Sequence, residues 1–120
     1  MEREDLKTRT KQFALRIIRL SNNLQEKGVC ASTLAKQILR SGTSVGANYR
    51  AACIAKSDND YINKLKICEE EADETTYWLE LLRESNLIAD ELLKDLHDES
   101  RQLTAIITAS IKTKRRNMAK

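Results

Sequence analysis

The 120-residue chain is long enough for one domain with a single core of modest size. It has no proline, three glycines and 4 % aromatic residues, a composition that favours long helices joined by short turns. A charged fraction of 32 % and the lack of an apolar run of about 20 residues exclude a membrane-spanning protein. The acidic N-terminal sequence is unlike a signal peptide. We therefore expect a cytoplasmic protein with no membrane partner.

Charge is distributed unevenly along the chain. Residues 1–56 contain 11 Lys and Arg against 4 Asp and Glu, and residues 57–100 contain 4 against 14. Residues 101–120 contain 6 basic residues and no acidic one. Two interpretations fit this pattern. In the first, basic and acidic helices neutralise one another inside a bundle or between subunits. In the second, a basic surface made from the first helix and the C-terminal tail binds nucleic acid.

The first half of the chain predicts two amphipathic helices. Apolar residues at helical spacing indicate a first helix over residues 5–27, which Gly28 ends as a C-terminal glycine. A second helix is expected over residues 32–55, with Ser32 or Ala31 as its N-terminal cap. The turn between them is short, so the two helices should be antiparallel neighbours.

The third helix, expected over residues 58–85, has the clearest pattern. Ser57 followed by Asp60 has the form of a capping box. From Tyr61 to Leu82, apolar residues then alternate at spacings of four and three. This heptad-like pattern indicates packing against a neighbouring helix at a shallow angle.

The fourth helix is expected over residues 90–114. Leu92 belongs to its apolar stripe, and His97 is interpreted as a surface residue. The basic tail, residues 115–120, is expected to be disordered. The predicted fold is an all-α, antiparallel up-down-up-down four-helix bundle in which residues 1–120 form one domain.

Gly42 and Gly46 lie in the middle of the expected second helix. Each costs about 1 kcal/mol of helix propensity relative to alanine, so tight packing should compensate for them. A phosphate-binding loop is excluded because no lysine follows the second glycine and no strand precedes the first. We interpret this segment as a place where two helices approach closely.

The third helix carries more apolar surface than one core needs. Ile67, Trp78 and Leu81 form a second stripe beside the heptad-like one. Two interpretations remain open: a wide arc that faces the core, or a subunit interface, where tryptophan is a favoured residue.

Two carboxylates lie on this second stripe. Glu71 and Glu74 require partners, because unpaired buried carboxylates are costly. Arg40 and Arg50 on the second helix are the natural candidates, together with Asn48. We expect these five residues to meet across a packed interface.

Catalytic and metal-binding patterns are not found in the sequence. Cys30, Cys53 and Cys68 lack CxxC spacing and fit the role of small buried hydrophobic residues. The residue three before His97 is Lys94, so the Glu-x-x-His pair of di-iron bundles is missing. We expect no catalytic residue, no bound metal and no cofactor, and therefore a protein that is not an enzyme.

Three segments of the chain resemble one bacterial protein family. These are residues 34–50, residues 64–80 and residues 106–113. They are similar to the four-helix-bundle family named for proteins encoded in intervening sequences of 23S ribosomal RNA genes. A more distant resemblance is to the accessory protein of diversity-generating retroelements, a basic pentameric barrel that associates with a reverse transcriptase and nucleic acid.

The resemblance implies a bundle that assembles into a ring-like homopentamer, with Trp78 near a subunit contact. The chain departs from the family pattern at Ala51, where relatives commonly have a glutamate. That departure leaves Arg50 available to bind an anion.

We therefore expect a non-enzymatic, oligomeric accessory protein that binds RNA or DNA through a basic surface without sequence specificity. The alternative is a protein-interaction scaffold whose charges serve self-assembly and a protein partner. The candidate nucleic-acid-binding residues are Lys7, Arg9, Lys11, Arg16, Arg19, Lys36 and Arg40.

Overall fold

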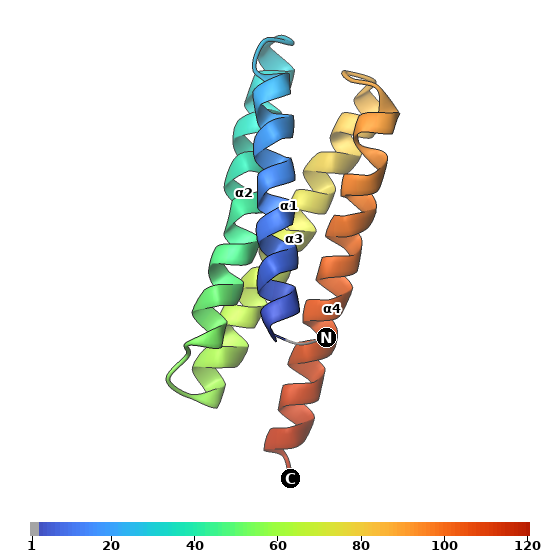
Figure 1. Cartoon of the computed structure of the whole chain (residues 1–120). Helices are drawn as coiled ribbons and strands as arrows, with labels where there is room; N and C mark the ends of the chain where they lie inside the picture. The colour runs from blue at the N-terminus through green and yellow to red at the C-terminus, as the bar shows by residue number, and fades with distance from the viewer. Residues whose placement is uncertain (1–2) are drawn as a thin grey trace.

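The computed structural model, which describes residues 3–120, is an all-α bundle of four long helices. The helices are α1 (Arg3–Leu24), α2 (Val29–Cys53), α3 (Asp58–Ser85) and α4 (Lys94–Met118), with a short 3-10 helix, η1 (Asp90–Leu92), before α4. The chain turns at alternate ends of a rod that measures 52 × 20 × 20 Å (Figure 1). The predicted four-helix all-α fold is confirmed.

The helix ends follow local hydrogen bonding. Ser57 caps α3 as predicted, since its hydroxyl accepts a hydrogen bond from the Asp60 amide at 3.1 Å. By contrast, α2 begins at Val29 and not near Ser32, because the Ser32 amide already donates to the Gly28 carbonyl at 2.9 Å. Gly28 has a φ of 111°, so this glycine makes the turn itself and precedes α2 without a side-chain cap.

The second half of the chain departs from the prediction at two places. Leu92 lies in η1 and is 63 % exposed, so it is not part of the core. The helix also continues past residue 114 to Met118, and the prediction of a disordered tail is wrong there. Lys114 explains the extension, because it pairs with Asp58 at 2.8 Å and lies over the Tyr61 ring.

The core is almost entirely aliphatic. Phe13 is its one phenylalanine, and the other large side chains that are fully buried are leucine, isoleucine and valine. Leu34 and Tyr61 pack against the core from its edge and are only partly buried. Small residues on α2, among them Ala31 and Ala35, are buried between the larger ones. The helices can therefore lie close together.

α1 and α2 approach each other closely at two glycines. A Cβ atom added at Gly42 would lie 2.7 and 2.8 Å from the Cγ1 and Cγ2 atoms of Ile17. One added at Gly46 would lie 3.2 Å from Thr10 Oγ1. The predicted role of the two glycines, close helix contact, is confirmed.

Buried hydroxyl groups form hydrogen bonds across each of the three large helix contacts. Every such group is nearly or fully excluded from solvent, and its partner lies on the neighbouring helix. The bonds join Ser21 Oγ to the Ala35 carbonyl, Thr75 Oγ1 to Ser41 Oγ, and Thr76 Oγ1 to Ser100 Oγ, at 3.2, 2.8 and 2.8 Å respectively.

Substitution of Gly42 by alanine should destabilise the fold although alanine is the better helix former. Ile17 is β-branched and fully buried, so it cannot move aside cheaply. Overpacking typically costs about 1–3 kcal/mol and the gain in helix propensity is about 1 kcal/mol, so we expect a net loss of about 0–2 kcal/mol in the free energy of unfolding, measured in urea.

Gly46→Ala is the matched control, because its new Cβ would meet Thr10 only at 3.2–3.4 Å. Gly46→Ala should lower the free energy of unfolding clearly less than Gly42→Ala does. In the double variant Gly42→Ala, Ile17→Ala, the combined loss should be smaller than the sum of the two single losses. A Gly42→Ala protein more stable than the parent would contradict the close-contact account.

Candidate functional site

Ion pairs between helices neutralise part of the basic first half. Arg9 of α1 binds Glu99 of α4 through two hydrogen bonds of 2.7 Å each, and its Nη2 also donates to Gln102 at 2.8 Å. The hydrogen bond to Glu99 raises the pKa of Arg9. This contact joins two helices that otherwise touch far less than sequence neighbours do. Arg9 thus has a structural role, and its charge is already satisfied.

Arg40 meets the predicted carboxylates. Its Nη1 donates to Glu71 at 3.2 Å and its Nη2 to Glu74. Glu74 also accepts a hydrogen bond from the indole N–H of Trp78 at 3.1 Å. The expected pairing of Arg40 with both glutamates is confirmed.

The other two predicted members of that cluster lie elsewhere. Asn48 donates to the Ser44 carbonyl of its own helix at 2.8 Å. Arg50 is exposed and faces the α1 side of the bundle. The expected contacts of Asn48 and Arg50 with the glutamates are therefore wrong, because these residues follow Arg40 by eight and ten positions, which turns them about 80° away from it on opposite sides.

A groove of about 540 Å³ runs between α1 and α2. Lys7, Lys11 and Arg50 line it, and Gly46 lies at its base where the helices are closest. Its remaining walls are small or hydroxylated side chains, apart from one carboxylate, Glu4. That group is largely exposed and pairs with Lys7 at 3.2 Å. The remaining lining residues are Thr8, Thr10, Ala14, Thr43 and Ala47.

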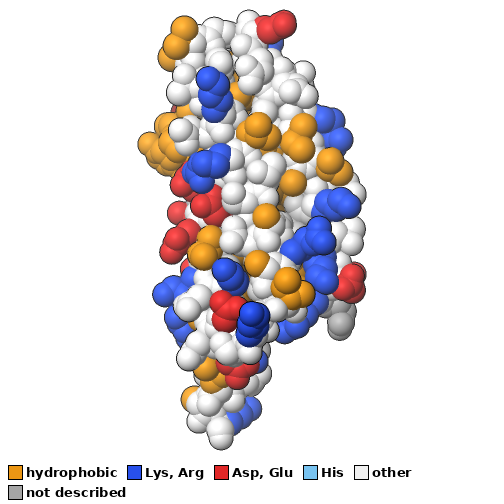
Figure 2. Space-filling view, turned by 90° about the vertical axis from the view of Figure 1, so that its left-hand side faces the viewer, with side chains coloured by type: hydrophobic (Ala, Val, Ile, Leu, Met, Phe, Trp, Pro, Cys, Tyr) orange, Lys and Arg blue, Asp and Glu red, His pale blue; other side chains and the backbone are white. Residues whose placement is uncertain are grey.

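Lys36 extends the same basic surface along α2. Lys36, Thr43 and Arg50 follow one another at seven-residue spacing, which places them on one face of the helix. Figure 2, which looks onto α2, shows basic side chains along one edge of this face and acidic ones along the other. Among residues 3–120, no carboxylate lies within 4.0 Å of Lys11, Lys36 or Arg50 in an ion pair.

Arg16 and Arg19 lie on a different flank of α1. They line a second groove, of about 480 Å³, between α1 and the α3–α4 connection. The structure thus divides the seven predicted binding residues into three groups. Arg9 and Arg40 are held in ion pairs between helices, Lys7, Lys11 and Lys36 belong to the α1–α2 surface, and Arg16 and Arg19 border the second groove.

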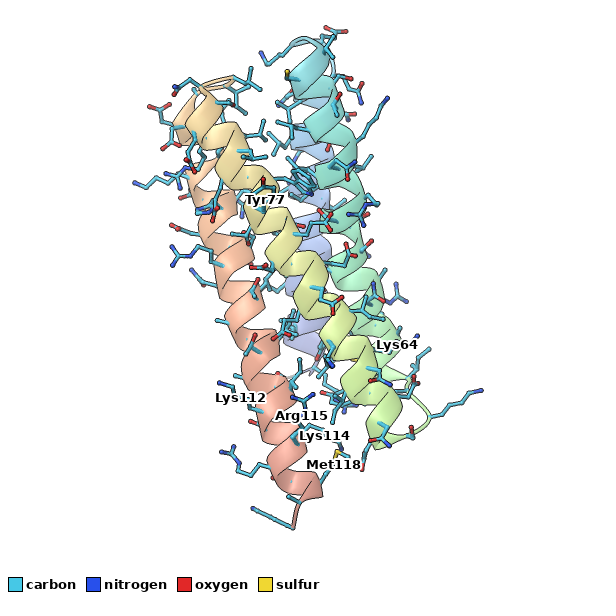
Figure 3. The ribbon with its side chains drawn as sticks, turned by 180° about the vertical axis from the view of Figure 1, so that it is seen from behind. Lys64, Tyr77, Lys112, Lys114, Arg115 and Met118 are labelled. Carbon is cyan, nitrogen blue, oxygen red and sulfur yellow. The ribbon has the colours of Figure 1, made fainter. Side chains whose placement is uncertain are left out.

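The outer face of α3 carries exposed apolar side chains. Tyr77 is 52 % exposed, and its ring meets that of Trp78 edge to face at a centroid distance of 5.1 Å (Figure 3). Ile67 is exposed and Leu81 half-buried on the same helix. Sequence reasoning missed Tyr77, although its position next to Trp78 was the available signal.

His97 is buried, with 8 % exposure, so its assignment to the surface is wrong. Its Nδ1 lies 3.0 Å from Arg83 Nη1, and a guanidinium can only donate, so Nδ1 is the acceptor. The proton of the neutral ring is then on Nε2, which has no hydrogen-bond partner among the described residues and lies 3.6 Å from Glu80. Arg83 also binds Asp90 through two hydrogen bonds, which lower the pKa of Asp90.

The cysteines are dispersed over the bundle. Cys68 is buried, and burial raises the pKa of its thiol to about 12. Cys53 is half-buried, whereas Cys30 is exposed, so the expectation of buried cysteines is wrong for Cys30. Within residues 3–120, no group of three His, Cys, Asp or Glu side chains could hold a metal ion.

Comparison with known proteins identifies the family. The family model described as 23S rRNA-intervening sequence protein matches residues 3–109. The chain belongs to this family. The match includes α1 to α3 and most of α4, and stops before the basic C-terminal end of α4.

A solved structure supports the assignment. The chain is similar to a protein of unknown function from the S23 ribosomal protein family of Bacteroides thetaiotaomicron, with 41 % identity and a TM-score of 0.83. The similarity covers 89 % of this chain and 98 % of the other. No functionally curated protein matches the chain. In the described part of the chain, no helix has both the length and the apolar character needed to cross a membrane.

The Arg9–Glu99 contact should stabilise the fold more than an ordinary surface pair does, because both side chains are partly buried and the contact is bidentate between two helices with little other contact. We expect Arg9→Gln to lower the free energy of unfolding by about 1–2 kcal/mol and to speed amide exchange in the first turns of α1.

Lys7→Gln is its control, since the pair of Lys7 with Glu4 is exposed and lies within one helix. That change should cost about 0–0.5 kcal/mol. Equal losses for the two variants would show that Arg9 does not hold α1 against α4.

Proposed function

We propose that this protein is an oligomeric, non-enzymatic accessory protein that binds the phosphate backbone of RNA or DNA along the α1–α2 surface. The observation that carries the proposal is the convergence of Lys7, Lys11 and Arg50 on one groove, with Lys36 on the same face of α2. Unlike Arg9 and Arg40, three of these four cations have no carboxylate partner among the described residues.

The walls of the groove suit a sugar-phosphate backbone. Lysine, arginine and threonine hydroxyl groups are common phosphate partners, and Thr8 and Thr43 line this groove. The α2 wall also includes Thr43 and Ala47, whose short side chains leave room for a strand. No aromatic side chain lines the groove, so bases have no stacking surface there. Binding should therefore be electrostatic and independent of sequence.

The C-terminal end of α4 adds a second source of positive charge. Lys112, Lys114 and Arg115 follow one another on the last turns of the helix (Figure 3). Lys114 is paired with Asp58, whereas Lys112 and Arg115 are exposed. A long polyanion bound along the α1–α2 surface could thus also meet this end of the molecule.

We further propose that the protein assembles into a homopentamer, the state that the family resemblance implies. The outer face of α3 supports self-association, because Tyr77 is exposed there beside Trp78, which is half-buried against the core. Its polar groups are satisfied before docking, since Arg40 binds Glu71 and Glu74. An interface on this face would therefore bury no unpaired carboxylate from that cluster.

Nucleic-acid binding should depend on the α1–α2 cations and on salt. In fluorescence anisotropy with a labelled single-stranded RNA and a labelled DNA duplex, affinity should fall steeply as salt rises. The triple variant Lys11→Gln, Lys36→Gln, Arg50→Gln should bind more weakly and reduce the slope of log K against log salt by about 2–3.

A second triple variant, Lys56→Gln, Lys66→Gln, Lys94→Gln, removes the same net charge from exposed positions elsewhere and should keep most of the affinity. If both variants lose affinity equally, net charge and not this surface determines binding. If the parent protein binds neither probe at low salt, the proposed function is wrong.

The oligomeric state is measured by light scattering. We expect a mass of five times the 13.7 kDa chain for the parent protein. Tyr77→Ala and Trp78→Ala should each shift the mass towards the monomer, because an aromatic residue in an interface core commonly contributes about 2 kcal/mol or more.

Ile54→Ala serves as the control, since Ile54 is 81 % exposed and lies away from that face, in the turn after α2. Its mass should equal that of the parent. A monomeric parent at micromolar concentration would refute the assembly, and a pentamer unaffected by both aromatic variants would place the interface elsewhere.

A further inference from the structure

The groove between α1 and the α3–α4 connection has a different chemistry from the α1–α2 groove. Its floor consists of four aliphatic side chains, and three cations border it on the α1 side. The floor residues are Leu20, Ile88, Leu92 and Leu96, and the bordering cations are Arg16, Arg19 and Lys27.

The groove exists because α1 and α4 separate towards this end of the bundle. Arg9 of α1 contacts Glu99 in the second turn of α4, and beyond this contact the last turns of α1 diverge from the start of α4 (Figure 1). Asn86, in the left-handed conformation, ends α3 and sends the chain into a connection that places Leu92 in η1. Leu92 is consequently left largely exposed at the edge of the groove.

The cations at this groove lack anionic partners. In the described part of the chain, Arg16, Arg19 and Lys27 form no ion pair within 4.0 Å, and no carboxylate lines the groove. The groove therefore combines a local excess of positive charge with an apolar lining in which Leu92 is exposed and Ile88 half-buried. A ligand that matches both properties must carry negative charge beside an apolar surface.

The shape and chemistry favour a helix over a nucleic acid. A sugar-phosphate backbone would bury no apolar surface against leucine and isoleucine, and no aromatic side chain is available to stack on a base. An amphipathic helix places apolar side chains at spacings of three and four on one face and can carry carboxylates beside them. Such a helix can fill the floor and reach Arg16, Arg19 and Lys27 together.

We propose that this groove binds an acidic amphipathic helix of a protein partner. Leucine-sized side chains of the partner pack on Leu92 and Ile88, and its Asp or Glu side chains pair with Arg16 and Arg19. The contact is small and open to solvent, so its affinity is that of a transient complex.

The protein-binding groove and the α1–α2 surface are separate sites. Lys11 and Arg16 are five residues apart on α1, which places them about 140° apart around the helix. The inference therefore does not depend on nucleic-acid binding. It assigns Arg16 and Arg19 to a protein partner, whereas the sequence groups them with the nucleic-acid-binding residues.

The test uses a fluorescein-labelled synthetic peptide with leucines on one helical face and glutamates on both sides of them. Titration of the full chain is followed by anisotropy, and contacts are mapped by NMR from the methyl groups of Leu20, Leu92 and Leu96. We expect saturable binding with shifts confined to these methyl groups. Leu92→Ser and Arg19→Glu should each weaken binding at least tenfold.

Matched controls distinguish binding in the groove from non-specific electrostatic or hydrophobic binding of the peptide. Ile54→Ser changes an apolar residue that is even more exposed than Leu92, and Lys36→Glu reverses a cation of the α1–α2 surface. Both variants should bind the peptide like the parent. A peptide with lysine in place of every glutamate, and one of the same composition without an apolar face, should not bind.

Four results would overturn the proposal. The first is the lack of any methyl shift at millimolar peptide, and the second is unchanged affinity in Leu92→Ser. In the third, dodecanoate or RNA displaces the peptide and shifts the same methyl groups, so the groove binds a lipid or a nucleic acid. In the fourth, Leu92→Ser or Arg19→Glu reduces the mass in light scattering, so a second copy of the chain covers the groove. The triple variant Lys11→Gln, Lys36→Gln, Arg50→Gln tests whether the two sites are separate. If they are, this variant binds nucleic acid more weakly but binds the peptide like the parent.

Discussion

The contact between α1 and α2 determines much of the rest of the structure. Gly42 and Gly46 remove the side chains that would keep the two helices apart, and Ile17 and Thr10 occupy that space. Because α1 is held so closely to α2, it lies far from α4 over most of its length. The same contact brings Lys7 and Lys11 next to Arg50, and it leaves the second groove open on the opposite flank.

The uneven charge of the sequence has two roles in the folded chain, and the two interpretations are not exclusive. Arg9 and Arg40 neutralise carboxylates of the acidic second half across helix contacts. Lys11, Lys36 and Arg19 have no such partners among residues 3–120 and remain on the surface. Charge counts along the sequence could not separate these groups, because pairing depends on which helical flank faces which neighbour.

Features that repeat along one helix were predictable from the sequence. Apolar spacing predicted four helices, and the Ser57 cap and the two α2 glycines had local signals. Features that depend on how each helix is rotated about its own axis were not predictable. The spacing around Arg40 is compatible with partners on either flank, so Arg50 was expected beside the α3 glutamates and instead faces α1.

Other predictions were wrong where a residue contacts a partner that is distant in the sequence, because such a contact cannot be inferred from neighbouring residues. His97 is buried because α3 supplies Arg83 as its hydrogen-bond donor. The last turns of α4 stay helical because Lys114 reaches Asp58 at the start of α3. Neither partner can be recognised from the residues next to His97 or Lys114. The family resemblance was predictable, since its motifs are continuous runs of residues within α2, α3 and α4.

The buried hydroxyl bonds have a consequence for helix register. A core made of leucine, isoleucine and alanine would tolerate sliding of one helix along another, because aliphatic side chains at repeated spacing fit in several positions. Each bond, such as Thr75 to Ser41 or Thr76 to Ser100, forms only in one alignment. A shift by one helical turn, about 5.4 Å, would break these interhelical bonds and leave each hydroxyl only its hydrogen bond to a carbonyl of its own helix. These small polar residues thus select one alignment of the helices from several that the aliphatic core would accept.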